Sequence, residues 1–307
     1  MNSKVLVGRF APSPTGALHL GSLIAATGSY LFAKAAGGEW LLRMEDLDTP
    51  RVVPGAADGI LRTLELFALY WDGEVTYQSS RGELYEEALS NLLQSGMAYP
   101  CGCTRREIQA LASAPHPGEE GPIYPGTCRG GLPKGHEPRA YRVIVPDQEI
   151  FFDDLLRGKL GWNLANSIGD FVVKRADGIF AYQLAVAVDD ALGGVTQVIR
   201  GSDLLSSTPR QILLQRLLGY PTPRYGHLPL VTAPDGEKLS KRDNLVNYGT
   251  IEARQGQAGK LLESVLDFLG HAPPADLSGA PPNELLRYAT ENFDKTRIPL
   301  SNRPLIG

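Results

Sequence analysis

The apolar positions in the first third of the chain predict alternating strands and helices. An apolar run over 5–10 predicts a strand, and apolar residues then recur at helical spacing from Leu20 to Leu31 until a pair of glycines ends them. A second strand is predicted over 39–45 and another helix over 84–93. Strand, helix and strand in this order are typical of a parallel α/β sheet.

This alternation is interrupted in the middle of the chain. Residues 100–140 are rich in proline and glycine, and so long an irregular stretch in a compact domain needs something to hold it in place. Apolar runs over 171–174 and 180–186 then predict strands. The first pattern resumes with a strand over 195–200 and a helix over about 207–219. We therefore expect an α/β sheet that is split by an insertion.

The composition is that of a soluble globular enzyme. The 307 residues suffice for one large core or two to three modest domains, and 43% are apolar and 21% charged. A net charge of −4 gives no overall basic signal for nucleic acid, although a local basic patch is compatible with it. No apolar run approaches the roughly 20 residues that span a bilayer, and no signal peptide precedes the first strand. These features predict a cytoplasmic protein with no membrane partner.

A candidate anion site lies where the first helix begins. The segment 17–22, Ala-Leu-His-Leu-Gly-Ser, follows the strand over 5–10 and a Pro/Gly turn. Free amide groups and the helix dipole at such a position attract phosphate, His19 can donate to its oxygens, and Gly21 lets the backbone approach closely. Taken alone, this short motif more often marks only a helix start with a partly buried histidine.

A second motif changes that interpretation. Lys238 and Lys241 flank Ser240 in a compact basic loop that follows a short apolar run over 228–231. A basic turn is usually just solvated surface. Phosphoryl chemistry, however, needs positive charge where the transition state gathers negative charge. Together the two motifs predict chemistry at the α-phosphate of ATP.

The pair resembles the "HIGH" and "KMSKS" signatures of class I aminoacyl-tRNA synthetases. The strings over 8–16 and 198–205 are similar to the glutamyl and glutaminyl branch, and the resemblance covers roughly residues 1–250. The chain departs from the signatures at Ser22, in place of a second histidine, and at Arg242, in place of a final serine. The resemblance implies His19, Lys238 and Lys241 as catalytic residues, with His19, Gly21 and Lys241 on ATP and Mg²⁺ assisting.

The fold that this resemblance implies is a Rossmann-type class I catalytic domain, split by a zinc-containing insertion and followed by a small helical segment. We expect the catalytic domain over 1–80 and 190–235. The acceptor-type insertion is expected over 81–189, with its cysteine-rich loop over 100–130. The lysine loop and the helical segment fill 236–307.

Selection of glutamate needs groups for two carboxylates and one ammonium. Two arginines and one acid satisfy it, because arginine makes paired, charge-assisted contacts with carboxylates. Arg9, Glu45 and Arg200 lie at the ends of predicted strands, where open parallel sheets bind ligands. The resemblance implies Arg9, Ser13, Glu45, Tyr182 and Arg200 as the glutamate-binding set. For Tyr182, inside an apolar run, a packing role is about equally expected.

The cysteines suggest a metal site. All three are clustered, which argues against a disulfide framework: Cys101, Cys103 and Cys128. A structural zinc ion takes four ligands, so one more is needed. Ligand frequencies favour His116 or His136, whereas the family pattern implies Tyr124, which we prefer. The alternative is three reduced thiols without metal. We expect one structural Zn²⁺ per chain.

The tail after Lys241 has roughly 60 residues, with helices predicted over 261–269 and 284–292. That is too few for a domain that reads the anticodon. A short synthetase with this cysteine cluster resembles the glutamyl-queuosine tRNA(Asp) synthetase family. The implied partners are glutamate, ATP and tRNA(Asp) that contains queuosine. The implied reaction forms glutamyl-adenylate and then esterifies queuosine in the anticodon loop. No obligate protein partner is evident.

Three alternatives stay open at this point. One is a truncated glutamyl-tRNA synthetase that charges a tRNA 3′ end, against which the missing anticodon domain argues. Another is an inert RNA-binding paralogue, against which the intact His19, Lys238 and Lys241 and the modest net charge argue. The last is a small-molecule nucleotidyltransferase, which would not need the set of Arg9 and Glu45.

Overall fold

A computed structural model describes residues 5–104, 106–108, 123–132, 134–232 and 255–304. The sequence-predicted Lys238 and Lys241, and the alternative zinc ligand at position 116, lie outside these described residues.

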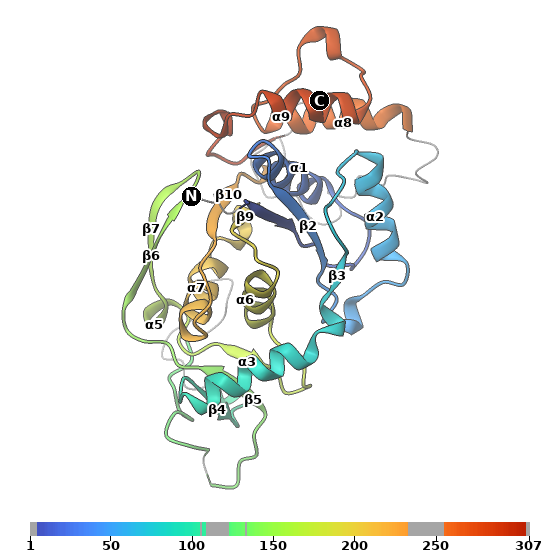
Figure 1. Cartoon of the computed structure of the whole chain (residues 1–307). Coiled ribbons are helices and arrows are strands. Elements are labelled where there is room, and N and C mark those ends of the chain that lie inside the picture. The colour runs from blue at the N-terminus through green and yellow to red at the C-terminus, as the bar shows by residue number, and fades with distance from the viewer. Residues whose placement is uncertain (1–4, 105, 109–122, 133, 233–254, 305–307) are drawn as a thin grey trace.

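Parallel strands form the centre of the molecule (Figure 1). The strands are β1 (Val7–Phe10), β2 (Glu39–Met44), β3 (Thr76–Tyr77), β9 (Gln197–Gly201) and β10 (Arg224–Leu228). β1 pairs with β2, β2 with β3, and β9 with β10, all in parallel. The two groups meet where the Val7 amide donates to Thr196 Oγ1 and the Thr196 amide donates to the Val7 carbonyl, both at 2.9 Å. The strands predicted over 5–10, 39–45 and 195–200 are therefore present.

Helices cover this sheet as the apolar periodicity requires. α1 (Leu20–Lys34) contacts β1, β2 and β9, and α2 (Ala56–Leu66), which the sequence reading did not predict, precedes β3. α3 (Gly82–Gln94) and α7 (Ser207–Leu217) match the predicted helices. Single-turn 3₁₀ segments connect the larger elements: 49–51, 78–80, 202–204, 275–277 and 295–297.

One prediction is wrong. The run over 180–186, expected to be a strand, belongs largely to helix α6 (Tyr182–Leu192). Every residue from Gln183 to Asp190 is buried, because α6 packs against α3, α7 and β8. A helix buried on all sides has no polar face, so its apolar run cannot be told from a buried strand by periodicity.

The central part of the chain forms smaller antiparallel structures (Figure 1). β4 (Ala98–Cys101), β5 (Ala140–Val143) and β8 (Val172–Lys174) make one sheet, and β6 (Glu149–Asp154) and β7 (Gly158–Asn163) make a hairpin. The short α5 (Leu164–Ser167) follows the hairpin. The strand predicted over 171–174 is thus present as β8.

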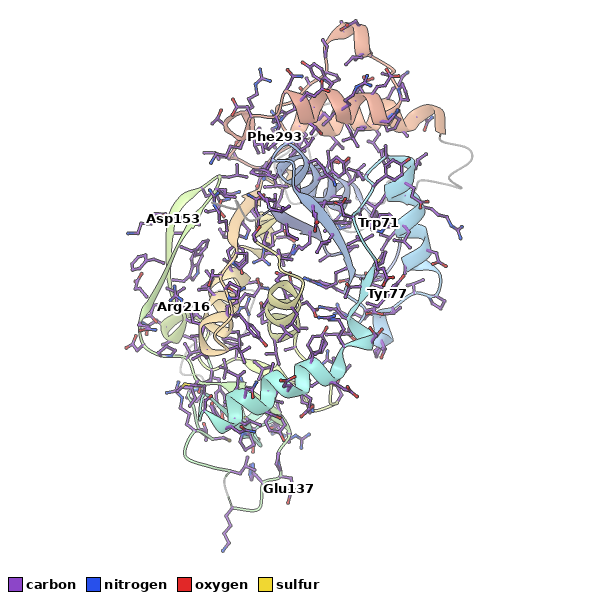
Figure 2. The ribbon with its side chains drawn as sticks, viewed as in Figure 1. Trp71, Tyr77, Glu137, Asp153, Arg216 and Phe293 are labelled. Atoms are coloured by element: carbon purple, nitrogen blue, oxygen red, sulfur yellow. The ribbon has the colours of Figure 1, made fainter. Side chains whose placement is uncertain are left out.

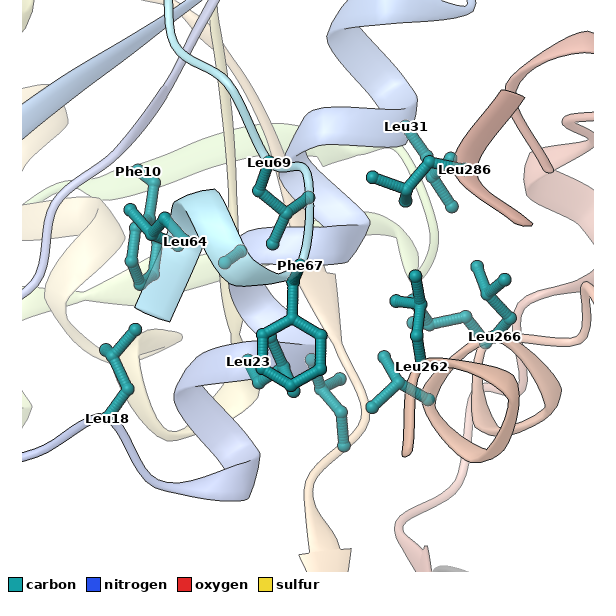
Figure 3. Close-up of a cluster of buried hydrophobic side chains, with 14 of the residues drawn as sticks. Phe10, Leu18, Leu23, Leu31, Leu64, Phe67, Leu69, Leu262, Leu266 and Leu286 are labelled. Carbon is teal, nitrogen blue, oxygen red and sulfur yellow. The ribbon is translucent and has the colours of Figure 1, made fainter. Parts of the chain in front are cut away.

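Two helices at the C-terminal end, α8 (Gln255–Phe268) and α9 (Pro282–Glu291), lie against α1. Figure 3 shows Leu262, Leu266 and Leu286 facing Leu23 and Leu31 of α1 in one buried cluster. Phe293, labelled in Figure 2, packs edge-on against Phe32 of α1 with ring centroids 4.9 Å apart. β11 (Val231–Thr232) and β12 (Arg303–Pro304) pair in parallel. This packing fixes α1, whose N-terminus opens onto the cleft described next.

Within the described ranges, no helix is long and apolar enough to cross a membrane.

Candidate active site

A cleft of about 820 Å³ opens at the carboxyl ends of β1, β2 and β9. Ligands bind at this edge of open parallel sheets because the strands end there and the following loops diverge. Every sequence-predicted site residue for ATP and glutamate that the structure describes lines the cleft: Arg9, Ser13, His19, Gly21, Glu45, Tyr182 and Arg200. The structure thus brings together residues up to 191 positions apart in the chain, from Arg9 to Arg200.

His19 caps the N-terminus of α1. Its Nδ1 accepts a hydrogen bond from the Ser22 amide at 3.1 Å, so the ring proton is on Nε2, 3.1 Å from the Ser22 hydroxyl. The side chain is exposed to the cleft. A Cβ at Gly21 would lie 3.2 Å from His19 Cε1 and Nδ1. Glycine here leaves room for the imidazole, and Ser22 orients that ring.

Arg9 is almost fully buried and is anchored from α6. Its Nε donates to Asp190 Oδ1 at 3.3 Å and its Nη2 to Oδ2 at 3.5 Å. Asp190 also accepts from Arg43 Nη1 at 2.7 Å. Burial raises the pKa of Asp190, but the two guanidinium groups outweigh it and lower that pKa overall. The ionised Asp190 therefore holds Arg9 in the lining of the cleft and Arg43 next to it.

Glu45, directly after β2, is a buried carboxyl group with spare acceptor capacity. Its Oε1 lies 3.5 Å from Arg43 Nη2 and has no hydrogen-bond partner among the described residues. Burial raises the pKa of Glu45 to about 6, although Arg43 and Arg9 oppose the rise. A buried acceptor on a residue that lines a cleft fits a cationic ligand group such as an ammonium.

Arg200, near the end of β9, presents one free donor group. Its Nε is 3.2 Å from His227 Nε2 and its Nη2 donates to Thr208 Oγ1 at 2.7 Å. Its Nη1 is buried and lacks a hydrogen-bond partner in the described part of the chain. Because a buried guanidinium nitrogen normally has an acceptor, this atom fits an anionic ligand in the cleft.

Tyr182 and Ser13 complete the cleft. Tyr182 is the first residue of α6. It therefore lies at a helix N-terminus and not inside the strand that the apolar run predicted. Burial, followed by the nearby charge of Glu45, raises the pKa of the Tyr182 phenol, while Arg200 and Arg9 oppose the rise. The phenol therefore lies within electrostatic range of all three charged groups. Ser13 is an exposed residue in the turn after β1.

Several residues that hold these groups were not predicted. Arg43 precedes Glu45 by two positions, which in an extended chain puts both side chains on the same side, and that spacing was a usable signal. The adjacent Asp189 and Asp190 in an apolar run were another, because buried acids need partners. His227 gave no signal that could be found without the fold. Asp189 accepts hydrogen bonds from three side chains: Gln78, Arg81 and Tyr85.

The three cysteines meet in a second site between β4 and the following loop. Their Sγ atoms all lie within 4.8 Å of one another, with Cys103 and Cys128 at 3.6 Å. Tyr124 Oη lies 3.4 Å from Cys101 Sγ and 3.5 Å from Cys103 Sγ. No histidine in the described ranges joins the group, and His136 is not among its members.

These distances fit a tetrahedral metal ion. With zinc–sulfur bonds near 2.3 Å, tetrahedral sulfurs are roughly 3.8 Å apart and an oxygen ligand is roughly 3.5 Å from each sulfur. Burial and the neighbouring cysteines raise the pKa of the Cys103 thiol to about 11, although Tyr124 opposes the rise. A dication offsets such a cost, because it binds the thiolate form. The residues present therefore fit Zn²⁺.

Comparison with known proteins shows to which family the chain is similar. The family model of the catalytic domain of class I tRNA synthetases (E and Q) matches residues 4–276. A Glutamyl-Q tRNA(Asp) synthetase of Geobacter sulfurreducens is 57% identical over 97% of this chain and 95% of its own length. One of Thiobacillus denitrificans is 53% identical over 97% of each chain.

Solved structures agree with these sequence matches. The glutamate-tRNA synthetase of Elizabethkingia anophelis superimposes with a TM-score of 0.80 at 28% identity, over 98% of this chain and 68% of that one. A glutamate tRNA ligase from Elizabethkingia meningosepticum, solved in complex with its amino acid, gives the same score and identity over 99% and 67%. From the parallel sheet, the cleft at its carboxyl edge and these matches, the chain belongs to the glutamyl-Q tRNA(Asp) synthetase family of class I tRNA synthetases.

Proposed function

We propose that this enzyme activates glutamate with ATP and transfers it to queuosine in tRNA(Asp). The observation that carries the proposal is the charge pattern of one cleft beside the N-terminus of α1. Two anchored arginines line it together with Glu45, whose Oε1 has no hydrogen-bond partner among the described residues. The acceptor is taken from the relatives, whose names specify glutamyl-Q and tRNA(Asp).

Glutamate fits this cleft by its charges. Arg9 and Arg200 would take the two carboxylates, and Glu45 would take the ammonium, with the Tyr182 hydroxyl beside it. Two arginines already fixed by Asp190 and His227 lose little side-chain entropy when the ligand binds. Each binding group is thus held before the substrate arrives.

The first step joins glutamate to the α-phosphate. An oxygen of the α-carboxylate attacks the α-phosphorus of ATP, the new carboxyl–phosphate bond forms, and the bond to the pyrophosphate oxygen breaks. The amide groups at the start of α1 and the His19 Nε2–H would stabilise the charge on the phosphate oxygens. Lys238 and Lys241 would supply charge from the lysine loop, which lies outside the described residues, and Mg²⁺ would accompany ATP.

The second step transfers the glutamyl group. A hydroxyl of the queuosine cyclopentenediol attacks the carbonyl carbon of the adenylate, an ester forms, and AMP leaves with the bonding electrons. The hydroxyl proton is lost to the leaving phosphate or to water. Positioning in the cleft supplies most of the rate enhancement, because the adenylate is already an activated acyl group.

We further propose a structural zinc ion held by Cys101, Cys103, Cys128 and Tyr124. Bound there, zinc would supply a cross-link between the start of the Pro/Gly-rich segment, at Cys101 and Cys103, and Cys128 within it. Arg142 supports the site: its guanidinium lies 4.0 Å from the Tyr124 ring centroid, and its Nε donates to Cys101 Sγ at 3.4 Å. Its positive charge partly offsets the negative charge of the ligand set.

The domain organisation follows from the same pattern. We propose that residues 1–80 and 190–235 form one catalytic domain that the insertion 81–189 divides, with 236–307 as the tail. Support comes from the parallel pairing of β1 to β3 and of β9 with β10, whereas β4, β5 and β8 pair antiparallel.

Two assays test the function. Glutamate-dependent ATP–pyrophosphate exchange without tRNA should be measurable with the wild type, should collapse in Lys241→Ala, and should persist in the surface control Lys260→Ala. Absence of exchange in the wild type would favour an inert RNA-binding protein. Labelled glutamate should then appear on the anticodon-loop fragment of tRNA(Asp) only when queuosine is present. Label on the 3′-terminal adenosine would refute the acceptor and favour a truncated glutamyl-tRNA synthetase.

A further inference from the structure

Arg200 is the last of three buried charged or titratable groups that are connected by hydrogen bonds. Asp154 Oδ2 is 2.6 Å from His227 Nδ1, and His227 Nε2 is 3.2 Å from Arg200 Nε. All three residues are at most 4% exposed. Asp154 is the last residue of β6, His227 lies in β10, and Arg200 lines the cleft. These hydrogen bonds therefore link the β6–β7 hairpin to the proposed glutamate site.

Backbone contacts orient the carboxylate. Asp154 Oδ1 accepts from the amides of Leu156 and Arg157, both at 3.0 Å, which leaves Oδ2 to face the histidine. Burial raises the pKa of Asp154, but His227 and these amides outweigh it and lower that pKa overall. An ionised carboxylate only accepts hydrogen bonds, so the His227 proton is on Nδ1.

The other ring nitrogen is therefore an acceptor. Burial lowers the pKa of His227, Arg200 and Arg157 add to this effect, and only Asp154 opposes it, so the ring is neutral at pH 7. His227 Nε2 then receives the Arg200 Nε–H and lies 3.0 Å from the Thr208 hydroxyl. Tyr225, stacked on the ring with centroids 6.3 Å apart, is the remaining titratable neighbour.

We propose that His227, oriented by Asp154, is a positioning residue for glutamate: its Nε2 atom holds Arg200 so that the free Nη1 faces the substrate carboxylate. This inference rests on the proposed glutamate-binding role of Arg200. With Nε held by His227 and Nη2 by Thr208, the plane of the guanidinium is fixed. The opposite histidine tautomer would place the His227 Nε2–H against the Arg200 Nε–H, and the guanidinium would no longer be held.

Asp154→Asn tests the tautomer with little change in shape. The three backbone amides at Oδ1, those of Leu156, Arg157 and His227, should keep the asparagine oxygen in that place, because an NH₂ group there would face three donors. The asparagine NH₂ then donates to His227 Nδ1, and the proton moves to Nε2. We expect the KM for glutamate in pyrophosphate exchange to rise roughly ten- to one-hundred-fold, the range for a lost hydrogen bond to a charged group. The KM for ATP, and kcat at saturating glutamate, should change less than threefold.

Asp153→Asn is the matched control. Asp153 is the neighbouring acid on β6 and is exposed, and Figure 2 shows it on the outer side of the hairpin. The control should keep the wild-type KM for glutamate. An unchanged glutamate KM in Asp154→Asn, or an equal rise for ATP and glutamate, would overturn the proposal and leave the pair a packing role.

Nuclear magnetic resonance tests the same point without turnover. In the ¹⁵N-histidine-labelled wild type, two-bond ¹H–¹⁵N correlations should show a neutral His227 ring with its proton on Nδ1, and the signals would be assigned by their loss in His227→Phe. A proton on Nε2, or a cationic ring at pH 7, would overturn the proposal even if Asp154→Asn fails to fold. If instead the wild type lacks exchange activity, the proposed function fails while the tautomer is still measured.

Discussion

Glu45 makes a prediction that separates a binding carboxyl group from a structural one. Its pKa rises to about 6 because burial outweighs the attraction of Arg43 and Arg9. Only the ionised form can pair with the ammonium of glutamate. The apparent KM for glutamate should therefore vary as one plus the ratio of protonated to ionised Glu45. With a pKa of about 6, this factor, and with it the KM, grows roughly tenfold from pH 7 to pH 5. Glu45→Gln should raise the KM and remove this dependence.

The same pKa makes acid favourable for stability although it weakens glutamate binding. A carboxyl group with a folded pKa above its unfolded value of 4.5 stabilises the folded state in acid and loses that contribution as pH rises through about 6. Relative to acid, where it is protonated in both states, Glu45 then costs the folded state about 2 kcal/mol at pH 7.5 and about 0.8 kcal/mol at pH 5. Glu45→Gln should gain about that much in its free energy of unfolding, and more at the higher pH.

Both effects are measurable with the same two proteins. Pyrophosphate exchange at graded glutamate concentrations between pH 5 and 8 gives the KM, and urea denaturation at pH 5 and 7.5 gives the free energy of unfolding. The reasoning is refuted if the wild-type KM is flat over this range, or if Glu45→Gln is less stable than the wild type at pH 7.5. The second result would make Glu45 a structural partner of Arg43.

Three more perturbations follow from the contacts. Asp190→Asn removes the charge that two buried arginines share, and should lower the free energy of unfolding in urea by roughly 3 kcal/mol; a loss under 1 kcal/mol would contradict the role given to this acid. Gly21→Ala crowds the His19 ring at 3.2 Å, and should lower the exchange rate several-fold while the melting temperature holds or rises; unchanged exchange would show that the ring is not confined there. Cys128→Ser should reduce bound zinc, measured by elemental analysis, from about one ion per chain to almost none; a wild type without zinc would refute the metal site.

The sequence predicted the parts of the fold that depend on local spacing. β1, β2 and β9 and the helices α1, α3 and α7 follow from apolar periodicity and from turn residues. The mouth of α1 was predictable in the same way, since His19 and Gly21 act within one helical turn. The clustering of the cysteines was visible in the chain because Cys101 and Cys128 are close in sequence.

Local pattern failed where burial decides the conformation. The run over 180–186 becomes part of helix α6 because neighbours cover it on all sides, and no periodicity records that cover. α2 was missed although its apolar residues are helically spaced, and its buried face consists of only Ala56, Ile60 and Leu64.

Sequence alone indicated Arg9, Glu45 and Arg200 for the cleft, because they lie at predicted strand ends, and the family resemblance implied Ser13 and Tyr182. Only the tertiary structure decided what each group can do. Asp190 meets Arg9 across 181 positions, and His227 meets Asp154 across 73. These contacts decide that Arg200 keeps one donor free and that Glu45 keeps an acceptor. The pKa of a buried group and the direction of its hydrogen bonds depend on which distant segments exclude water around it, and adjacency in the chain carries no record of that.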